Sequence, residues 1–484
     1  MQMIRRLLPL LAAVSLLGCA GKGGGKIEIP LLDPPGSKAP IFTQLTPGKH
    51  EASIMAIGGD RDLARGQNGS RHTMGYINNN DIETYLNGIR NRFVAVSGVT
   101  DVPGKVKLTA DLTHGAKASA DGNIFIPITW LLDTETEDAL AAVIAHELSH
   151  VLLKHQSTDI VGSIQKKLQS GHEMLLGLKM DVRKTTQLGK KDNKALLAAQ
   201  VSVALVDNLI MPSWNRRQET EADLLAVDLM IRAGYTPDGM DDMLQTMKTS
   251  EDKQQKSRAD IESQLKQLAL QNPELAVKKA ISTLVEDLSN THPETEKRRE
   301  AITDYRDKHY AEAPIPDYSS SAMKKLKAMH SVGPLLNNYR HTLKARNRLD
   351  EGNAQQAYSE ALLGVKAPTA KDAIPNWILW KTADATGKRG RHQDALKNVL
   401  NNSEPIKAVY EEIIAFEEQA GHHQIALNYV IKAQKVFGDD PEWTPHKIRL
   451  LSKLGRKDEV KLETAKCILD TPEQKHKCRE AAKS

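Results

Sequence analysis

Residues 138–155, with the sequence DALAAVIAHELSHVLLKH, are the most informative stretch of the chain. They are rich in Ala and Leu, lack Gly and Pro, and begin with an acidic first turn, which together predict one helix. This helix contains the pattern H-E-x-x-H as His146, Glu147 and His150. Residues four apart lie about 40° apart around a helix, so both imidazoles can bind one metal ion. Glu147 is then placed to take a proton from a water bound to that ion.

The side chains around this pattern are apolar, which predicts that the helix is buried. They include Val143, Ile144, Leu148, Val151 and Leu152. Burying two imidazoles and a carboxylate without a shared partner is costly, so a pair of polar surface histidines explains the pattern poorly. Zinc suits two imidazoles, a carboxylate and one open position, and it can lower the pKa of a bound water to about 7. We therefore expect one Zn2+ per chain, with His146 and His150 as ligands.

The residues that follow the pattern restrict the kind of zinc site. A metzincin site would need glycine at position 153 and histidine at position 156, where this chain has Leu153 and Gln156. The metzincin subclass is therefore excluded. His155 lies five residues after His150, about 140° around the same helix, and is a poor candidate for a ligand.

A second helix is predicted to begin at Arg216 with the sequence RRQETEAD, and to end at Gly234. Glycine commonly ends a helix, because it adopts the left-handed conformation without strain. Glu219 and Asp223 are four residues apart and share one face of this helix. Glu221 points to roughly the opposite side.

Together, HELSH at residues 146–150 and E-x-E-A-D at residues 219–223 resemble the zinc metallopeptidases related to CAAX prenyl protease, HtpX and Oma. GNIFIPITWLL at residues 122–132 is similar to the strand that precedes the zinc helix in that family. AGYTP at residues 233–237 is similar to the turn after the second helix. The resemblance covers about residues 75–305. It implies a gluzincin-type α+β domain with a small sheet, in a chain that is mainly α-helical.

The resemblance also implies roles for individual residues. Glu219 would be the third zinc ligand, and Asp223 would support catalysis by orienting a ligating histidine. Arg216 lies where family members often carry an arginine near the site, and is a candidate for transition-state support. An extended peptide would pair with an edge strand expected near residues 123–129. One departure is visible at residues 115–117, where Gly-Ala-Lys replaces the usual Asn-Ala-Phe.

A Thr-His-Pro sequence at residues 291–293 resembles one in periplasmic, TPR-bearing, BepA-like members of the same family. The resemblance suggests that His292 approaches the zinc as a fourth ligand and keeps the enzyme latent. The alternative is a capping or turn histidine that happens to precede a proline.

The N-terminus has the pattern of a lipoprotein leader. Residues 1–18 combine a basic start with a short apolar run, which is typical of a signal peptide. The sequence LLGC at residues 16–19 resembles a bacterial lipobox, which implies cleavage before Cys19 and acylation of that cysteine; the alternative is an ordinary signal peptide with an accidental cysteine. Residues 19–50 are rich in Gly and Pro and are expected to be a flexible tether. Ala20 is not aspartate, which in a Gram-negative cell resembles the sorting pattern of outer-membrane lipoproteins and implies an anchor in the outer membrane, facing the periplasm.

Four glycine-centred turns recur in the C-terminal third. They begin at Gly352, Gly390, Gly421 and Gly455. A spacing near 34 residues resembles tetratricopeptide (TPR) repeats, whose stacked helix pairs form a concave binding face. We therefore expect a zinc metallopeptidase domain over residues 51–315 and a TPR-like solenoid over residues 320–484; a generic helical bundle is the alternative for the second part.

Composition excludes several other classes of protein. The 484 residues contain 66 basic and 61 acidic side chains, which gives no concentrated basic face for a nucleic acid. Three cysteines exclude a disulfide-dense scaffold. In an oxidising compartment Cys467 and Cys478 could close a helical hairpin; the alternative is two unpaired buried thiols.

Two functions from different classes fit these observations. The first is a zinc-dependent endopeptidase of the cell envelope that takes a polypeptide substrate and is recruited to outer-membrane proteins by a protein partner on the TPR face. The second is a chaperone-like or scaffold lipoprotein in which proteolysis is latent or vestigial. The intact motif residues favour the enzyme, because a scaffold would tolerate the loss of Glu147.

Overall fold

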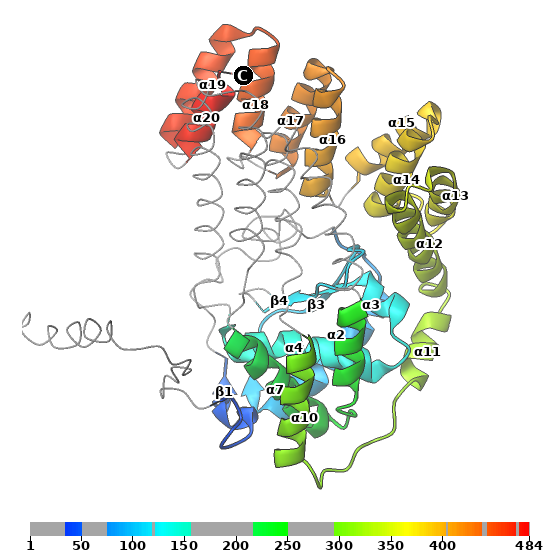
Figure 1. The fold of residues 1–484 in the computed structure, drawn as a ribbon, viewed down its shortest axis with the longest axis vertical. Helices are drawn as coiled ribbons and strands as arrows, with labels where there is room; N and C mark the ends of the chain where they lie inside the picture. Colours follow the sequence, from blue (N-terminus) through cyan, green and yellow to red (C-terminus); the bar gives the residue numbers. More distant parts are fainter. Residues whose placement is uncertain are drawn as a thin grey trace, which may run out of the picture.

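The computed structural model describes residues 34–50, 75–118, 122–155, 216–249, 295–402, 405–437, 443–470 and 474–483. Within these ranges the chain is mainly helical, with two small sheets beside the first group of helices (Figure 1). This confirms the predicted fold class. No helix among the described residues is both long enough and apolar enough to cross a membrane.

Helices from distant parts of the sequence form the first half of the structure. They are α2 (Asn80–Ser97), α3 (Ile128–Asp133), α4 (Glu137–Leu152), α7 (Arg216–Ala233) and α10 (Thr295–His309). Helix α4 is buried along its whole length and packs against both α2 and α7. The side chain of Thr136 caps α4 by accepting a hydrogen bond from the backbone N–H of Ala139, and acidic residues occupy its first turn. The helix predicted from the sequence is therefore present and lies at the centre of this half.

The sheet next to α4 has the strand order β3-β5-β4. Its strands are β3 (Val106–Thr109), β4 (Lys117–Ala118) and β5 (Ile124–Pro127). Strand β5 pairs in parallel with β3 and antiparallel with β4, so it is central. A second, two-stranded sheet pairs β1 (Gly48–Lys49) with β2 (Val99–Thr100).

The expectation of an edge strand near residues 123–129 was wrong. All four residues of β5 are buried, and the edge of this sheet nearest α4 is β4 instead. Residues 128–133 form helix α3 rather than a longer strand. Pro127 lacks a backbone N–H for the ladder and suits the residue before a helix, which accounts for the short strand.

Part of the segment expected to be a flexible tether packs against the helices. Residues 41–44 form the 3-10 helix η1 (Ile41–Gln44), which contacts α7. The backbone N–H of Ile41 donates to the hydroxyl of Tyr305 at 2.7 Å, and that of Phe42 donates to Asp228 at 2.7 Å. Ile41 is fully buried. Burial of Ile41 and these two hydrogen bonds dock the segment, so the tether expectation fails for residues 34–50. Residues 19–33 lie outside the described residues.

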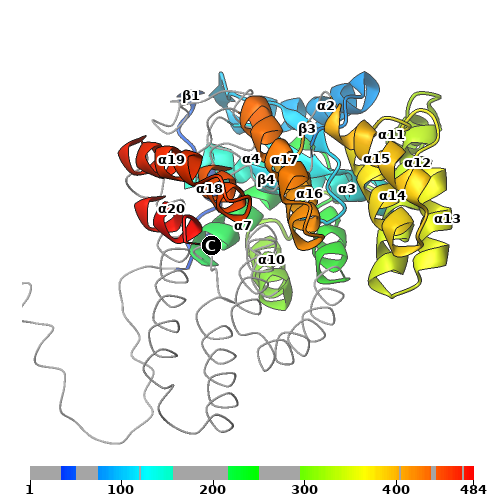
Figure 2. The ribbon, with the colours of Figure 1, turned by 90° about the horizontal axis from the view of Figure 1, so that it is seen from above.

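The second half of the structure consists of helices joined by short turns. They are α11 (Ser321–Ala328), α12 (Gly333–Asp350), α13 (Ala354–Gly364), α14 (Ala373–Ala385), α15 (Arg389–Leu400), α16 (Lys407–Gln419), α17 (His423–Phe437), α18 (Trp443–Lys453), α19 (Lys457–Asp470) and α20 (Lys475–Ala481). Successive helices pack on one another along a curved path from α11, beside the first half, to α20 (Figure 1, Figure 2). The first half of the structure is therefore followed by a helical C-terminal region.

Three of the four predicted turn glycines have the left-handed conformation that a turn requires. Gly352, Gly421 and Gly455 have φ values of 80°, 78° and 73°. Gly390 instead lies inside α15, and the corresponding turn is made by Gly387, with a φ of 68°. With this correction the turn glycines lie 35, 34 and 34 positions apart, which is more regular than the spacing expected from the sequence.

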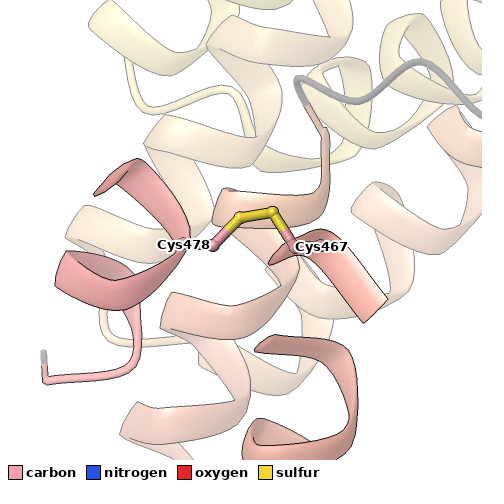
Figure 3. The surroundings of a disulfide bond; sticks show 2 residues. All are labelled: Cys467 and Cys478. Carbon is pink, nitrogen blue, oxygen red and sulfur yellow. A yellow bond between two sulfur atoms is a disulfide. The ribbon is translucent and has the colours of Figure 1, made fainter. Parts of the chain in front are cut away.

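The two halves share one hydrophobic core. A continuous buried cluster runs from the first helices to α16, and a second cluster joins α16 to α20. Polar contacts also cross between the halves: Arg346 on α12 donates to the carbonyl of Leu112 at 2.8 Å, and Lys327 on α11 donates to the carbonyl of Thr134 at 2.5 Å. Cys467 and Cys478 form a disulfide that joins α19 to α20 (Figure 3), which confirms the predicted pairing.

Candidate metal centre

Helices α4 and α7 bring three candidate ligands to one point. His146 and His150 lie one turn apart on α4, with their Nε2 atoms 3.2 Å from each other. A carboxylate from α7 faces both: Oε2 of Glu219 lies 3.6 Å from Nε2 of His146, and Oε1 lies 3.4 Å from Nε2 of His150. One ligand atom from each residue lies within 4.8 Å of the others.

The chemistry of these three groups fits a zinc ion. All three side chains are at most 3% exposed, so water cannot satisfy their inward-facing atoms. Both imidazoles turn the same nitrogen, Nε2, toward the Glu219 carboxylate. Two imidazole nitrogens and one carboxylate are the protein ligands of a catalytic zinc site that keeps one position open. Among the described residues no other group of three such side chains is close enough to hold a metal ion.

The outer nitrogen of His146 is held by a buried ion pair. Nδ1 of His146 lies 2.9 Å from Oδ1 of Asp223, one turn after Glu219 on α7. Arg298 on α10 donates to both oxygens of Asp223, each at 2.7 Å. Asp223 and Arg298 are 1% and 5% exposed. His146 is therefore fixed with Nδ1 toward a carboxylate and Nε2 toward the candidate metal.

The charges around the site shift its pKa values in opposite directions. Burial alone would raise the pKa of Asp223, but the neighbouring Arg298 guanidinium and the hydrogen bond with His146 lower it to about 2. Burial lowers the pKa of His146 despite the opposing effect of Asp223. For His150 burial acts in the same downward sense, but the hydrogen bond and charge of Glu219 outweigh it and raise the pKa.

The outer nitrogen of His150 faces a second polar chain. Nδ1 of His150 lies 3.0 Å from Nδ1 of His155. Nε2 of His155 lies 3.4 Å from Oε2 of Glu221, which is 2.9 Å from Nε of Arg217. His155 is 5% exposed, and burial lowers its pKa although Glu221 opposes the shift.

The start of α4 is anchored by the two acids of its first turn. Glu137 accepts hydrogen bonds from the hydroxyls of Tyr85 and Tyr235, at 2.8 and 2.9 Å. Asp138 accepts from the backbone N–H groups of Thr236 and Ser319, at 3.0 and 2.6 Å. These contacts fix the register of α4 against the turn that follows α7, and thereby place the histidines opposite Glu219.

Comparison with known proteins identifies this arrangement. Residues 99–306 match the sequence model of Peptidase family M48. The chain contains an M48 peptidase domain. The resemblance to zinc metallopeptidases seen in the sequence is therefore confirmed.

Curated relatives also match part of the chain. The mitochondrial metalloendopeptidase OMA1 of Schizosaccharomyces pombe is 26% identical over 175 residues, which are 36% of this chain and 47% of the yeast protein. The β-barrel assembly-enhancing protease of Yersinia pestis is 27% identical over 177 residues, 34% of this chain and 32% of that protein. The protein of the same name from Escherichia coli strain K12 is 23% identical over 171 residues, 35% of this chain and 34% of its own length. The chain thus spans half or less of the curated relatives it matches.

Sequence reasoning selected the three converging residues but missed their supports. Arg298 lies 75 positions from Asp223, and no local pattern links the two. His155 and Glu221 were set aside as ligands, which agrees with the structure, but their contact with each other was not foreseen. Arg216 begins α7, and its side chain lies outside the described residues, as do His292 and Cys19.

A lysine of the M48 domain interacts electrostatically with the general-base candidate Glu147. Lys117 lies on edge strand β4, which packs against α4. Burial lowers the pKa of Lys117, whereas the carboxylates of Asp111 and Glu147 oppose that shift. This lysine stands at the last position of the Gly-Ala-Lys departure noted in the sequence. Lys117 therefore lies within electrostatic reach of Glu147 at this edge of the sheet.

Proposed function

We propose that this chain is a zinc-dependent endopeptidase of the bacterial cell envelope that cleaves unfolded or misassembled membrane and periplasmic proteins. The convergence of His146, His150 and Glu219 in a buried M48 site carries the proposal. These three residues would bind one zinc ion. When bound, zinc supplies Lewis acidity toward the scissile carbonyl and lowers the pKa of a water.

The remaining chemistry belongs to side chains of α4 and α7. Glu147 follows the first ligand directly and is 4% exposed, so its carboxylate is almost fully buried. It would accept a proton from the attacking water at a carboxylate oxygen and deliver it to the nitrogen of the leaving amine. Asp223 holds the first imidazole in one tautomer, because its 2.9 Å contact with Nδ1 of His146 leaves Nε2 for the metal.

The substrate would bind as an extended strand along β4. Strand β4 lies at the edge of the sheet and packs against α4, so a peptide paired with it would pass the zinc ligands. Arg216 would support the transition state from the start of α7. His292 would act as a fourth ligand that keeps the enzyme latent, and His292→Ala is then expected to raise proteolysis; unchanged or lower cleavage would reject latency.

Recruitment and location extend the same proposal. A lipid on Cys19 would anchor the protein to the outer membrane, facing the periplasm. The regular spacing of the turn glycines supports TPR-like repeats over residues 320–484, whose concave face would bind a protein partner. The names of the β-barrel assembly-enhancing proteases support outer-membrane proteins or their assembly machinery as targets.

The first test uses the full chain and measures bound zinc together with cleavage of an unfolded β-barrel precursor. One zinc per chain is expected, with cleavage lost in Glu147→Gln while zinc is retained. Glu135→Gln is the matched control, because Glu135 is an exposed glutamate two positions before α4. Zinc without cleavage by either protein would favour the scaffold function. Folded protein without zinc would overturn the site.

A further inference from the structure

The two histidines of the candidate metal centre are supported in different ways. Nδ1 of His146 lies 2.9 Å from the carboxylate of Asp223, a charged group. His150 instead turns Nδ1 toward another imidazole, that of His155, at 3.0 Å. Two imidazole nitrogens at this distance can share only one proton, so one ring must donate and the other must accept.

The direction of this hydrogen bond follows from the ligand atom. His150 faces Glu219 through Nε2, so a metal there takes the Nε2 lone pair. A neutral imidazole that coordinates through Nε2 carries its proton on Nδ1. Nδ1 of His150 is therefore the donor, and Nδ1 of His155 is the acceptor. The proton of His155 is then on Nε2, where Oε2 of Glu221 lies 3.4 Å away.

The far end of this chain is fixed as well. Oε1 of Glu221 lies 2.9 Å from Nε of Arg217, one turn earlier on α7. The Glu221 side chain is 16% exposed and that of Arg217 is 36% exposed, so the ion pair lies at the rim of the site. Every donor from His150 outward thus has an acceptor, and the series ends on a carboxylate that is itself paired.

The backbone places His155 where an unbroken helix could not. Helix α4 ends at Leu152, and Lys154 has a φ of 58°. A non-glycine residue in this left-handed region is strained, and such residues cluster at functional sites. A continued helix would have put the His155 side chain about 140° around the axis from His150. The left-handed residue folds the chain back, and the two rings lie 5.0 Å apart between centroids.

We propose that His155, oriented by Glu221 and Arg217, is a positioning residue for His150. By accepting the Nδ1 proton it fixes the tautomer and the ring orientation that direct Nε2 toward the metal. This inference rests on the proposed zinc function of the site. It adds a supporting side chain from the residues after α4, opposite to the support that Asp223 gives to His146.

The test compares two substitutions of His155 in the full chain. His155→Leu removes the acceptor and is expected to weaken zinc binding 10- to 100-fold, measured by competition with a chromogenic chelator. His155→Asn returns an oxygen near the position of Nδ1 and is expected to recover most of that affinity. His422→Leu is the matched control. His422 forms a hydrogen bond with Glu417 on α16, and both residues are far from α4 in the sequence.

A second readout does not depend on catalysis. The visible absorption spectrum of the Co2+-substituted protein reports the ligand field, and it should change in His155→Leu and return toward the wild-type spectrum in His155→Asn. Thermal unfolding of the metal-free proteins identifies any variant that has lost its fold. If His155→Leu does not fold, Glu221→Leu takes its place. Zinc affinity and the Co2+ spectrum are then compared between Glu221→Leu, His155→Asn and the wild type.

The outcomes separate this inference from the proposed function. Wild type with one zinc per chain, together with His155→Leu that keeps wild-type affinity and Co2+ spectrum, would overturn the positioning role alone. An asparagine variant no better than the leucine variant would also overturn it, because packing would then explain the loss. Wild type that binds no zinc would overturn both, since His150 would have no ligand role to support.

Discussion

Replacing Arg298 by leucine isolates the ion pair behind the metal centre. The substitution removes the two hydrogen bonds that Asp223 accepts at 2.7 Å, and leaves its carboxylate 1% exposed with no water to replace them. Breaking a buried pair by removing one partner costs about 3–5 kcal/mol. The pKa of Asp223 is lowered from 3.8 to about 2, which corresponds to about 2 kcal/mol of stabilisation. This value is net of the cost of burying the carboxylate, so the ion pair itself contributes more, which is compatible with a loss of that size.

The loss of stability in Arg298→Leu should depend on pH in a defined direction. In the wild type the lowered pKa of Asp223 contributes stability that is complete above pH 4 and disappears as the pH falls through about 2. In Arg298→Leu burial is no longer opposed by the guanidinium, so the pKa of Asp223 rises and the folded variant binds a proton more readily than the unfolded chain. The difference in stability between the two proteins is therefore largest near neutral pH and narrows as the pH falls.

The assay is thermal unfolding of the zinc-free full chain at pH 7 and at pH 4. A loss of this size should lower the unfolding temperature of the first half of the structure by on the order of 10 °C at pH 7. Arg299→Leu is the control: its partner Asp241 and its own side chain are 36% and 38% exposed, so it should cost less than about 1 kcal/mol. Adding Asp223→Asn to Arg298→Leu should cost less than the sum of the single changes. A loss below about 1 kcal/mol, an additive double variant, or a pH-independent difference would refute the reasoning.

Three further predictions concern the packing of two glycines, the disulfide and the bound metal. Gly239→Ala should cost about 1–3 kcal/mol of stability, because a Cβ there would lie 2.4 Å from the carbonyl oxygen of Asp138. A Cβ at Gly390 would meet no atom within 4 Å, so Gly390→Ala should stabilise α15 by about 0.4–1 kcal/mol. Urea unfolding measures both changes in stability. Reducing the disulfide between Cys467 and Cys478, eleven positions apart, should lower the stability of the last helices by about 3 kcal/mol, and the double serine variant should unfold identically with and without reductant. A chelator should lower the unfolding temperature of the wild type, and added zinc should restore it in proportion to the logarithm of its free concentration.

The features that the sequence predicted correctly are those set by short, regular spacing. The pattern at His146 and His150 requires only helical periodicity, and α4 and α7 both have it. The grouping of Glu219 with Asp223 follows from the same 3.6-residue period, and the structure places Glu219 near both histidines and Asp223 near Nδ1 of His146. The disulfide was predictable because only two cysteines remained after Cys19 was assigned to lipid.

The features that the sequence missed depend on chain reversals and on partners far apart in sequence. Helical geometry placed His155 away from His150, and a single left-handed residue at Lys154 reversed that conclusion. Arg298 reaches Asp223 from a helix that begins 72 positions later. The central position of β5 is set by pairing with β4 and β3, and a buried apolar strand reads the same whether it is central or at an edge.

The anchoring of α4 links the C-terminal helices to the metal centre. Ser319, which precedes α11, exchanges hydrogen bonds with both acids at the start of α4: its carbonyl accepts from the backbone N–H of Glu137 at 2.7 Å, and its own N–H donates to Asp138 at 2.6 Å. Asp138 lies about two turns before His146 on a helix that is buried throughout. A buried helix cannot shift at one end without repacking along its length. A movement of residue 319 would therefore break hydrogen bonds at the first turn of α4. The C-terminal helices are thus coupled to the helix that carries both histidines.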